Sequence, residues 1–115
     1  MIAVIFEVIP HAEHTQEYLD IAADLKPVLE KLDGFISVER FQSLTDPKKI
    51  LSLSFFQDEG SILQWRTLQK HRKAQAAGRN VVFENYRLRV ANVIRDYGMF
   101  EREEAPEDSL SVHKT

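Results

Sequence analysis

The sequence predicts an α+β domain with a ferredoxin-like β-α-β-β-α-β order, in which two helices cover one face of a four-stranded antiparallel sheet. Apolar, β-branched runs alternate with two amphipathic segments in that order along the chain. The second and third strands are joined by a short turn, which is typical of an antiparallel hairpin. The length of 115 residues, with 43% apolar and 29% charged residues, fits one globular domain.

The first strand and helix are expected before Gly34. Residues 2–9 form an apolar, β-branched run that is typical of a buried strand. Thr15 is expected to cap a helix whose apolar residues recur at helical spacing, and Gly34 is expected to end it. Pro27 offers no N–H to the preceding turn, so it is expected to kink or split this helix.

A hairpin follows, and then a second helix and a long last strand. Residues 35–44 and 50–56 alternate with a period of two. Asp58 begins a helix start signal, and the helix is expected over 62–77, with few apolar residues. Residues 81–97 form a stretch longer than an ordinary strand.

The domain is expected to cover residues 1–98, followed by an acidic, mobile tail over 99–115. Two helices can cover only one face of the sheet, yet every strand carries apolar residues on both sides. A homodimer that pairs the two open sheet faces is the simplest way to bury that surface. The long last strand could also extend the partner's sheet and cover its edge.

Composition excludes several function classes. The net charge of −3 argues against a nucleic-acid surface, and no apolar run is long enough to span a membrane. The absence of cysteine excludes disulfides, thiolate nucleophiles and zinc sites with Cys ligands. The start of the chain carries no secretion signal, so a cytoplasmic location is expected. The order of elements also occurs in RNA-recognition motifs and acylphosphatases, but the chain lacks both the basic aromatic strand and the Gly-rich loop of those classes.

Three segments together resemble the antibiotic biosynthesis monooxygenase (ABM) domain family. They are Gly34-Phe-Ile-Ser-Val-Glu-Arg-Phe41, then Trp65-Arg66 with His71-Arg72-Lys-Ala-Gln75 and Gly78-Arg79, and Tyr86-Arg-Leu-Arg-Val90 continuing to Tyr97. The resemblance covers about residues 1–98 and implies a dimeric α/β barrel. It also implies a monooxygenase that oxygenates a small quinol- or phenol-like aromatic molecule with molecular oxygen and no cofactor or metal.

The haem-degrading branch of that family uses an Asn on the first strand, a Trp on the second helix and a His ten residues later. Trp65 matches, but Glu7 stands on the first strand and Gln75 stands ten residues after the Trp. The resemblance therefore does not extend to haem degradation.

Oxygenation without a cofactor requires a base or cation that stabilises a deprotonated, electron-rich substrate inside a dry pocket. On the second helix Trp65 could stack on an aromatic ligand, and His71 is the natural base at neutral pH. We expect these two residues to be catalytic. Expected substrate-binding residues are Leu68, Phe55, Arg66 and Asn85.

Plainer interpretations remain open for several of these residues. Trp65 could simply fill the core, and His71 lies in a charged run that is typical of a solvated helix face. Arg40 and Arg79 are expected in ion pairs or dimer contacts. His11, Glu13 and His14 have a possible metal-binding spacing but suggest no further ligand, so no metal is expected. The alternative function is a non-catalytic dimeric module that binds a small ligand or a partner protein.

Overall fold

The computed structural model describes residues 1–76 and 82–108, with the backbone alone for residues 68–76. The elements follow the predicted order. They are β1 (Ile2–Pro10), a short 3₁₀ turn (Ala12–His14), α1 (Thr15–Glu30), β2 (Phe35–Gln42), β3 (Ile50–Phe56), α2 (Glu59–Ala76) and β4 (Phe83–Asn92).

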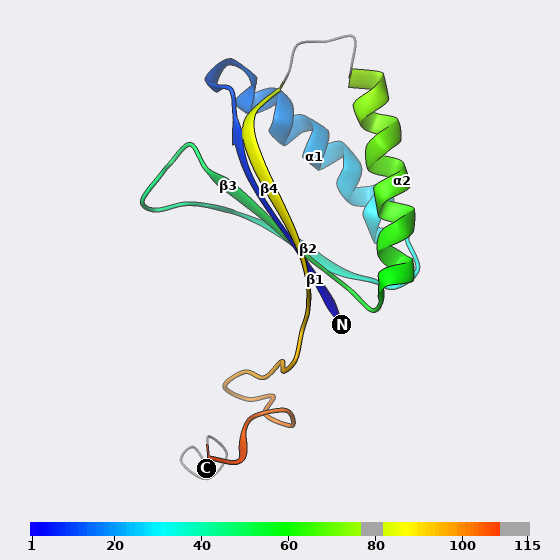
Figure 1. Ribbon diagram of the computed structural model, residues 1–115, viewed down its shortest axis with the longest axis vertical. Coiled ribbons are helices and arrows are strands. Elements are labelled where there is room, and N and C mark those ends of the chain that lie inside the picture. Colours follow the sequence, from blue (N-terminus) through cyan, green and yellow to red (C-terminus); the bar gives the residue numbers. More distant parts are fainter. Residues whose placement is uncertain (77–81, 109–115) are drawn as a thin grey trace.

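The four strands form one antiparallel sheet in the order β2-β3-β1-β4 (Figure 1). β1 lies in the centre and pairs with β3 on one side and β4 on the other. This arrangement confirms the predicted ferredoxin-like fold. The sheet is open, so β2 and β4 are both edge strands in the single chain.

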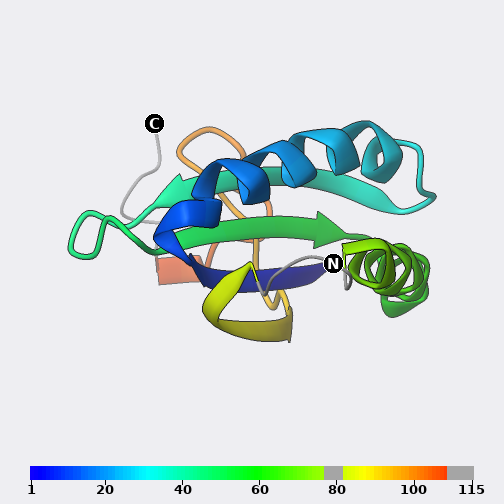
Figure 2. The ribbon, with the colours of Figure 1, turned by 90° about the horizontal axis from the view of Figure 1, so that it is seen from above.

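The two helices lie on the same side of the sheet but cover it unequally. Figure 2 shows α1 lying along β2 and β3, whereas α2 is seen end-on and stands away from the sheet. Beneath the helices are two core clusters. The first contains Val4, Leu29, Phe56, Ile62 and Trp65, and the second contains Val8, Tyr18 and Ile50. No helix lies over β4 in Figure 2, so that edge of the helix-bearing face is left open.

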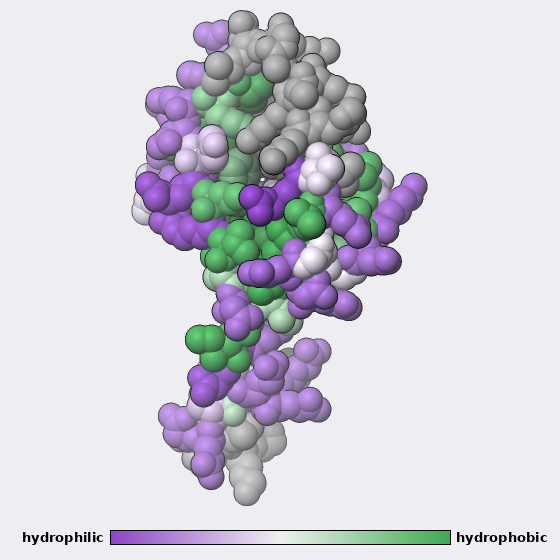
Figure 3. Space-filling model, turned by 45° about the vertical axis from the view of Figure 1, so that its right-hand side comes forward, coloured by the Kyte–Doolittle hydropathy of each residue, from purple (hydrophilic) through white to green (hydrophobic). Residues whose placement is uncertain are grey.

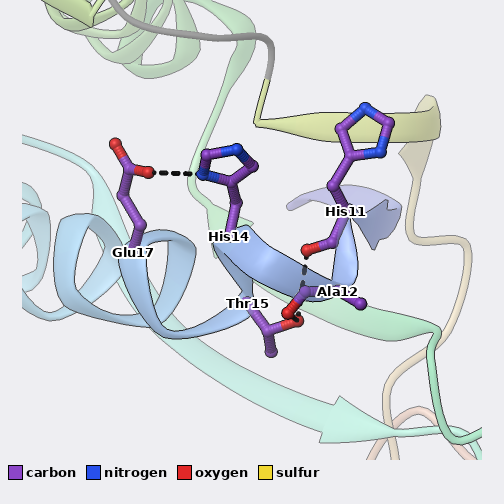
Figure 4. A network of polar contacts seen from close by, with 5 residues as sticks. All are labelled: His11, Ala12, His14, Thr15 and Glu17. Carbon is purple, nitrogen blue, oxygen red and sulfur yellow. Dashed lines mark hydrogen bonds and ion pairs between the residues drawn. The ribbon is translucent and has the colours of Figure 1, made fainter.

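Both ends of α1 differ from the prediction. Thr15 is the first residue of α1 and not its cap, because its hydroxyl donates to the carbonyls of His11 and Ala12 at 3.5 Å (Figure 4). The preceding 3₁₀ turn already supplies the start of the helix. α1 continues through Pro27 as one helix. α1 ends at Glu30 with Lys31 as its C-cap, so Gly34 is not the helix stop that the sequence predicted; its φ of +82° belongs to the turn that leads into β2.

Asp58 caps the start of α2. Its Oδ1 accepts hydrogen bonds from the backbone N–H of Ser61 at 2.9 Å and from the Ser61 hydroxyl at 3.0 Å. This is the geometry of an N-cap residue, which satisfies the free N–H groups of the first helical turn. These hydrogen bonds lower the pKa of the Asp58 carboxyl below its usual value.

Asp58 should therefore make stability depend on pH. A carboxyl whose pKa is lower in the folded state adds stability above its unfolded pKa of about 3.9, and that stability is lost as the pH falls through the folded value. Asp58→Asn keeps a capping side chain but removes the titration. We expect urea midpoints of this variant to fall less than those of the wild type between pH of about 5.5 and 3.

Asp24→Asn is the matched control, because Asp24 is exposed on α1 and forms no hydrogen bond among the residues that the structure describes. Its pH dependence should follow that of the wild type. Equal slopes for Asp58→Asn and the wild type would contradict the assignment of Asp58 as a titrating cap.

β4 is shorter than the predicted strand over 81–97. The last backbone hydrogen bond between this segment and the segment of β1 is donated by the N–H of Val93 to the carbonyl of Met1, at 3.0 Å. β4 pairs only with β1, which begins at Ile2, so residues beyond 93 pair with no strand in the part of the chain that the structure describes. They lead away from the domain as an arm (Figure 1). The arm carries exposed apolar side chains, at Ile94, Met99 and Phe100.

The sheet face opposite the helices, here called the open face, is largely apolar. Residues paired directly across strands share a face, which places together Ala3, Ile5, Leu51, Leu53 and Phe55. Within it Arg89 donates to Glu7 Oε2 at 2.7 Å. This hydrogen bond lowers the pKa of the Glu7 carboxyl, so Glu7 is an anion beside Arg89 and opposite Arg87 at the edge of the apolar residues of this face.

Candidate functional site

The uncovered part of the helix-bearing face forms an apolar surface on β4, here called the β4 shelf. It consists of Tyr86, Leu88 and Val90, which are 53%, 44% and 50% exposed. Their partners on β1 are Val8, Phe6 and Val4, so the shelf continues the core of the domain on the same face. Figure 3 shows hydrophobic side chains gathered on this side of the molecule. An exposed apolar surface next to a core is typical of a ligand or partner site.

Aromatic rings border one end of the β4 shelf. Phe6 lies 6.0 Å from Phe83 and 5.7 Å from Tyr86, measured between ring centroids. Phe83 also lies 5.6 Å from Tyr18 of α1. The rings meet at angles between 50° and 74°, so edges face rings. Such a surface can hold a flat or branched apolar molecule through aromatic edges and faces.

A histidine–carboxylate pair lies at the start of α1. His14 Nδ1 and Glu17 Oε2 are 2.8 Å apart, and the two side chains are 21% and 29% exposed (Figure 4). A carboxylate at this distance can fix the orientation of the imidazole ring. Tyr18, one residue after Glu17, contacts Phe83. The pair therefore lies at the end of the sheet that carries the aromatic rings.

No metal site is formed by the described residues. The structure groups no three His, Cys, Asp or Glu side chains at metal-binding distance within 1–76 and 82–108. His11, which the sequence placed beside Glu13 and His14, instead contacts the ring of His14 at 6.3 Å between centroids.

The residues predicted on α2 occupy different environments. Trp65 is 9% exposed and packs in the first core cluster, with its ring 6.4 Å from that of Phe56. Arg66 is exposed. The side chains of Leu68 and His71 lie outside the described part of the chain. The structure thus places Trp65 at the foot of α2, between the helix and the sheet.

Two other predicted residues lie on the open face, away from Trp65. Phe55 pairs with Ala3, and its neighbour Phe56 points to the opposite side of the sheet, against Trp65. Asn85 pairs with Ile9 and is exposed, and its side-chain oxygen accepts the N–H of Tyr86 at 2.9 Å. The sheet therefore separates Phe55 and Asn85 from the core tryptophan.

The ion pairs expected for Arg40 and Arg79 are not seen among the described residues. Arg40 forms no ion pair or hydrogen bond among the residues described, and Arg79 lies outside them. Glu7 pairs with Arg89 on the open face and does not face Trp65.

Sequence reasoning did not nominate the three residues of the β4 shelf. Their alternation along residues 86–90 placed them on one face of the sheet. Residues on a face that two helices cover are expected to be buried in the core, so these three gave no sign of being exposed. The feature that could have predicted the exposed surface is the composition of α2, whose few apolar residues cannot cover a full sheet face.

Comparison with known proteins gives one family and one curated relative. Residues 1–77 match the family model described as Antibiotic biosynthesis monooxygenase. The "Jasmonate monooxygenase ABM" of the fungus Pyricularia oryzae (strain 70-15) is 50% identical over 93 residues, which make up 81% of this chain and 43% of that protein. This chain therefore spans less than half the length of the relative.

Several solved structures share the fold. A conserved protein from Methanosarcina mazei Go1 has a TM-score of 0.67 at 20% identity, covering 79% of this chain and 90% of its own. Rv0793 from Mycobacterium tuberculosis has a TM-score of 0.71 at 12% identity, with coverage of 84% and 98%. The heme-degrader MhuD from the same organism, solved with two hemes bound, has a TM-score of 0.62 at 16% identity, with coverage of 85% and 100%. At these identities the likeness concerns the fold alone. Among the described residues, no helix is long and apolar enough to cross a membrane.

Proposed function

Since this chain belongs to the antibiotic biosynthesis monooxygenase family, we propose that it is a monooxygenase that transfers one atom of molecular oxygen to a small, largely apolar molecule held on the β4 shelf. The observation that carries the proposal is the 50% identity over 93 residues with a relative named as a monooxygenase. The open apolar shelf beside aromatic rings supplies a place for such a substrate.

The first candidate substrate class follows from the name of that relative. Jasmonate is a carboxylate with an apolar ring and side chain, and we propose a molecule of that class for this chain. Converting a C–H bond to an alcohol consumes O₂, two electrons and two protons, and it releases one water. The electrons must come from an added reductant, such as ascorbate or a reduced nicotinamide.

The second candidate class is a quinol- or phenol-like aromatic, favoured by the edge-to-face rings of Phe6, Phe83 and Tyr86. Here the substrate supplies the electrons. An activated CH₂ group that reacts with O₂ becomes a carbonyl and releases water, so the balance closes with no cofactor. The need for a reductant therefore distinguishes the two classes.

We propose Trp65 and His71 as the catalytic residues of α2, with Leu68 and Arg66 contributing to substrate binding. The position of Trp65 at the foot of α2 supports a role in shaping the inner end of the site. The His14–Glu17 pair is a second candidate base, supported by its 2.8 Å contact. Phe55 and Asn85 lie on the open face, so a binding role for them would require the substrate or a partner to reach that face.

The test is oxygenation under ¹⁸O₂ with product mass measured. Purified full-length chain is given jasmonate with ascorbate, or a polycyclic phenol without reductant. We expect saturable, enzyme-dependent incorporation of one ¹⁸O atom into one of the two. Leu88→Asp adds a charge to the exposed shelf and should raise KM about tenfold or more, since it disrupts apolar contacts with the substrate. Trp65→Phe should lower kcat.

Leu63→Asp is the matched control, because Leu63 is 63% exposed on α2 and outside the shelf. Its kinetics should equal those of the wild type. Absence of incorporation with both substrate classes, together with tight binding of either compound, would instead support the non-catalytic binding module. Turnover that is unaffected by Leu88→Asp would contradict the shelf as the substrate site.

We also propose that two copies of this chain form a homodimer that covers the open face. The domain in each copy comprises residues 1–98, and residues 99–115 form an appended tail. The apolar open face and the arm with exposed Ile94 and Phe100 support this, because both would gain burial from a second copy. Sedimentation at micromolar concentration should give a dimer, and Leu53→Asp should give a monomer. A wild-type monomer would contradict the proposal.

A further inference from the structure

A groove of about 500 Å³ lies where β1 passes into α1, away from the β4 shelf. Its walls come from the first turns of α1, from β2 and from the turn before β3. None of Phe6, Tyr86, Leu88 and Val90 lines it. Its volume falls within the range of about 300–1,000 Å³ that holds small molecules. The groove is therefore a second site of ligand size.

The groove contains a cation without a partner. Arg40 lines it, and its Nε is buried with no hydrogen bond in the part of the chain that the structure describes. A guanidinium is always charged and acts only as a donor, so an unpaired buried N–H on it is costly. Nε itself is closed off from the groove, but the two terminal nitrogens of the guanidinium are not among the buried atoms, and they can donate two hydrogen bonds to one carboxylate.

The other charges in the groove favour a single negative charge on the ligand. Lys48 and Glu84 also line it, so two cations stand against one carboxylate. A monoanion balances that set, whereas a dianion such as phosphate would face Glu84. The side-chain amide of Gln42 is already used, since it donates to the Pro47 carbonyl at 2.7 Å and ties β2 to the turn.

Apart from Thr15, the rest of the lining is apolar. Pro10 and Ile50 are buried, and Leu19 is 38% exposed on α1. Ile50 belongs to the second core cluster, with Val8 and Tyr18, so this wall is fixed by the core. A ligand that meets Arg40 with its charge would place its remaining atoms against hydrocarbon.

We propose that this groove binds a small monocarboxylate with an apolar body, its carboxylate on Arg40 and its hydrocarbon part against Leu19 and Ile50. The site is separate from the β4 shelf and goes beyond the proposed oxygenation. An apolar acid could then bind to the protein without occupying the β4 shelf. Binding can be measured without turnover, so it stands or falls independently of the proposed function.

The experiment is an NMR titration of the ¹⁵N-labelled full chain with octanoate, and with octanol as the uncharged probe. We expect saturable shifts of the Leu19, Arg40 and Lys48 amides with octanoate, and binding of octanol at least about tenfold weaker, since a charge-assisted hydrogen bond is lost. Arg40→Gln should weaken octanoate about tenfold or more and leave octanol unchanged. Arg95→Gln removes the same charge outside the groove and should bind as the wild type does.

Several results would overturn the proposal. They are equal affinity for octanol and octanoate, octanoate binding that Arg40→Gln leaves intact, and shifts confined to Tyr86 and Leu88 of the shelf. Absence of saturable shifts up to about 20 mM octanoate would overturn it as well. The melting temperature of Arg40→Gln should not fall below that of the wild type, because Arg40 has no side-chain partner to lose among the described residues and its buried N–H is unpaired there.

Discussion

Phe56→Ala is expected to lower the free energy of unfolding by about 3–5 kcal/mol. Phe56 is 0% exposed and lies at the centre of the first core cluster. Its ring packs against Phe35 at 5.7 Å and against Trp65 at 6.4 Å between centroids. Removing it leaves a cavity between the sheet and both helices. The measurement is urea unfolding followed by circular dichroism.

Phe56→Leu keeps the prediction testable if the alanine variant fails to fold. It retains most of the apolar volume, so a loss of about 1–2 kcal/mol is expected. A loss below about 1 kcal/mol for Phe56→Ala would contradict the central position given to this ring.

Gly34→Ala is expected to cost about 2–3 kcal/mol, the second largest effect. Gly34 has φ of +82°, a conformation that costs an L-residue about 1–2 kcal/mol. A Cβ at this position would also collide with the side chain of Ser61, which is buried and bonded to Asp58. The Gly34 carbonyl further accepts the N–H of Gln57 at 2.7 Å, so the backbone cannot easily move.

Gly98→Ala is the matched control for Gly34→Ala. A Cβ at Gly98 meets nothing within 4 Å, so its stability should stay within about 0.5 kcal/mol of the wild type. Urea unfolding of both variants measures the difference. A Gly34→Ala variant as stable as Gly98→Ala would show that the junction between β2 and α2 is not held as the structure has it.

The fold follows from the sequence because its local signals agree. The two hairpin strands alternate with a period of two and Asp58 starts α2, as expected, whereas α1 ends at Glu30 and not at Gly34. The resemblance to the ABM family, drawn from three segments, is confirmed by the family match over residues 1–77. The predicted end of β4 was wrong, because the alternation of residues 93–97 does not show whether a neighbouring strand is present to pair with them.

The candidate site was harder to predict, because it depends on which faces meet. Phe55 and Phe56 are neighbours in sequence but lie on opposite sides of the sheet. The shelf is open because no helix lies over β4 (Figure 2). That depends on the angle between α2 and the sheet, which no local sequence pattern gives. Arg40 likewise lacked any signal of being unpaired, since pairing depends on residues distant in the chain.

The central position of β1 also governs the order in which this chain can fold. β2 and β3 are joined by a short turn and can pair early, whereas β1 must wait for β3 and then for β4. Ile2 pairs with Asn92, across nearly the whole domain, so the sheet cannot be completed until residue 92 has been synthesised. Such distant pairings slow folding, since a large loop closes before they form. During synthesis the apolar first strand emerges long before its last partner, which makes it the segment that most needs protection from aggregation.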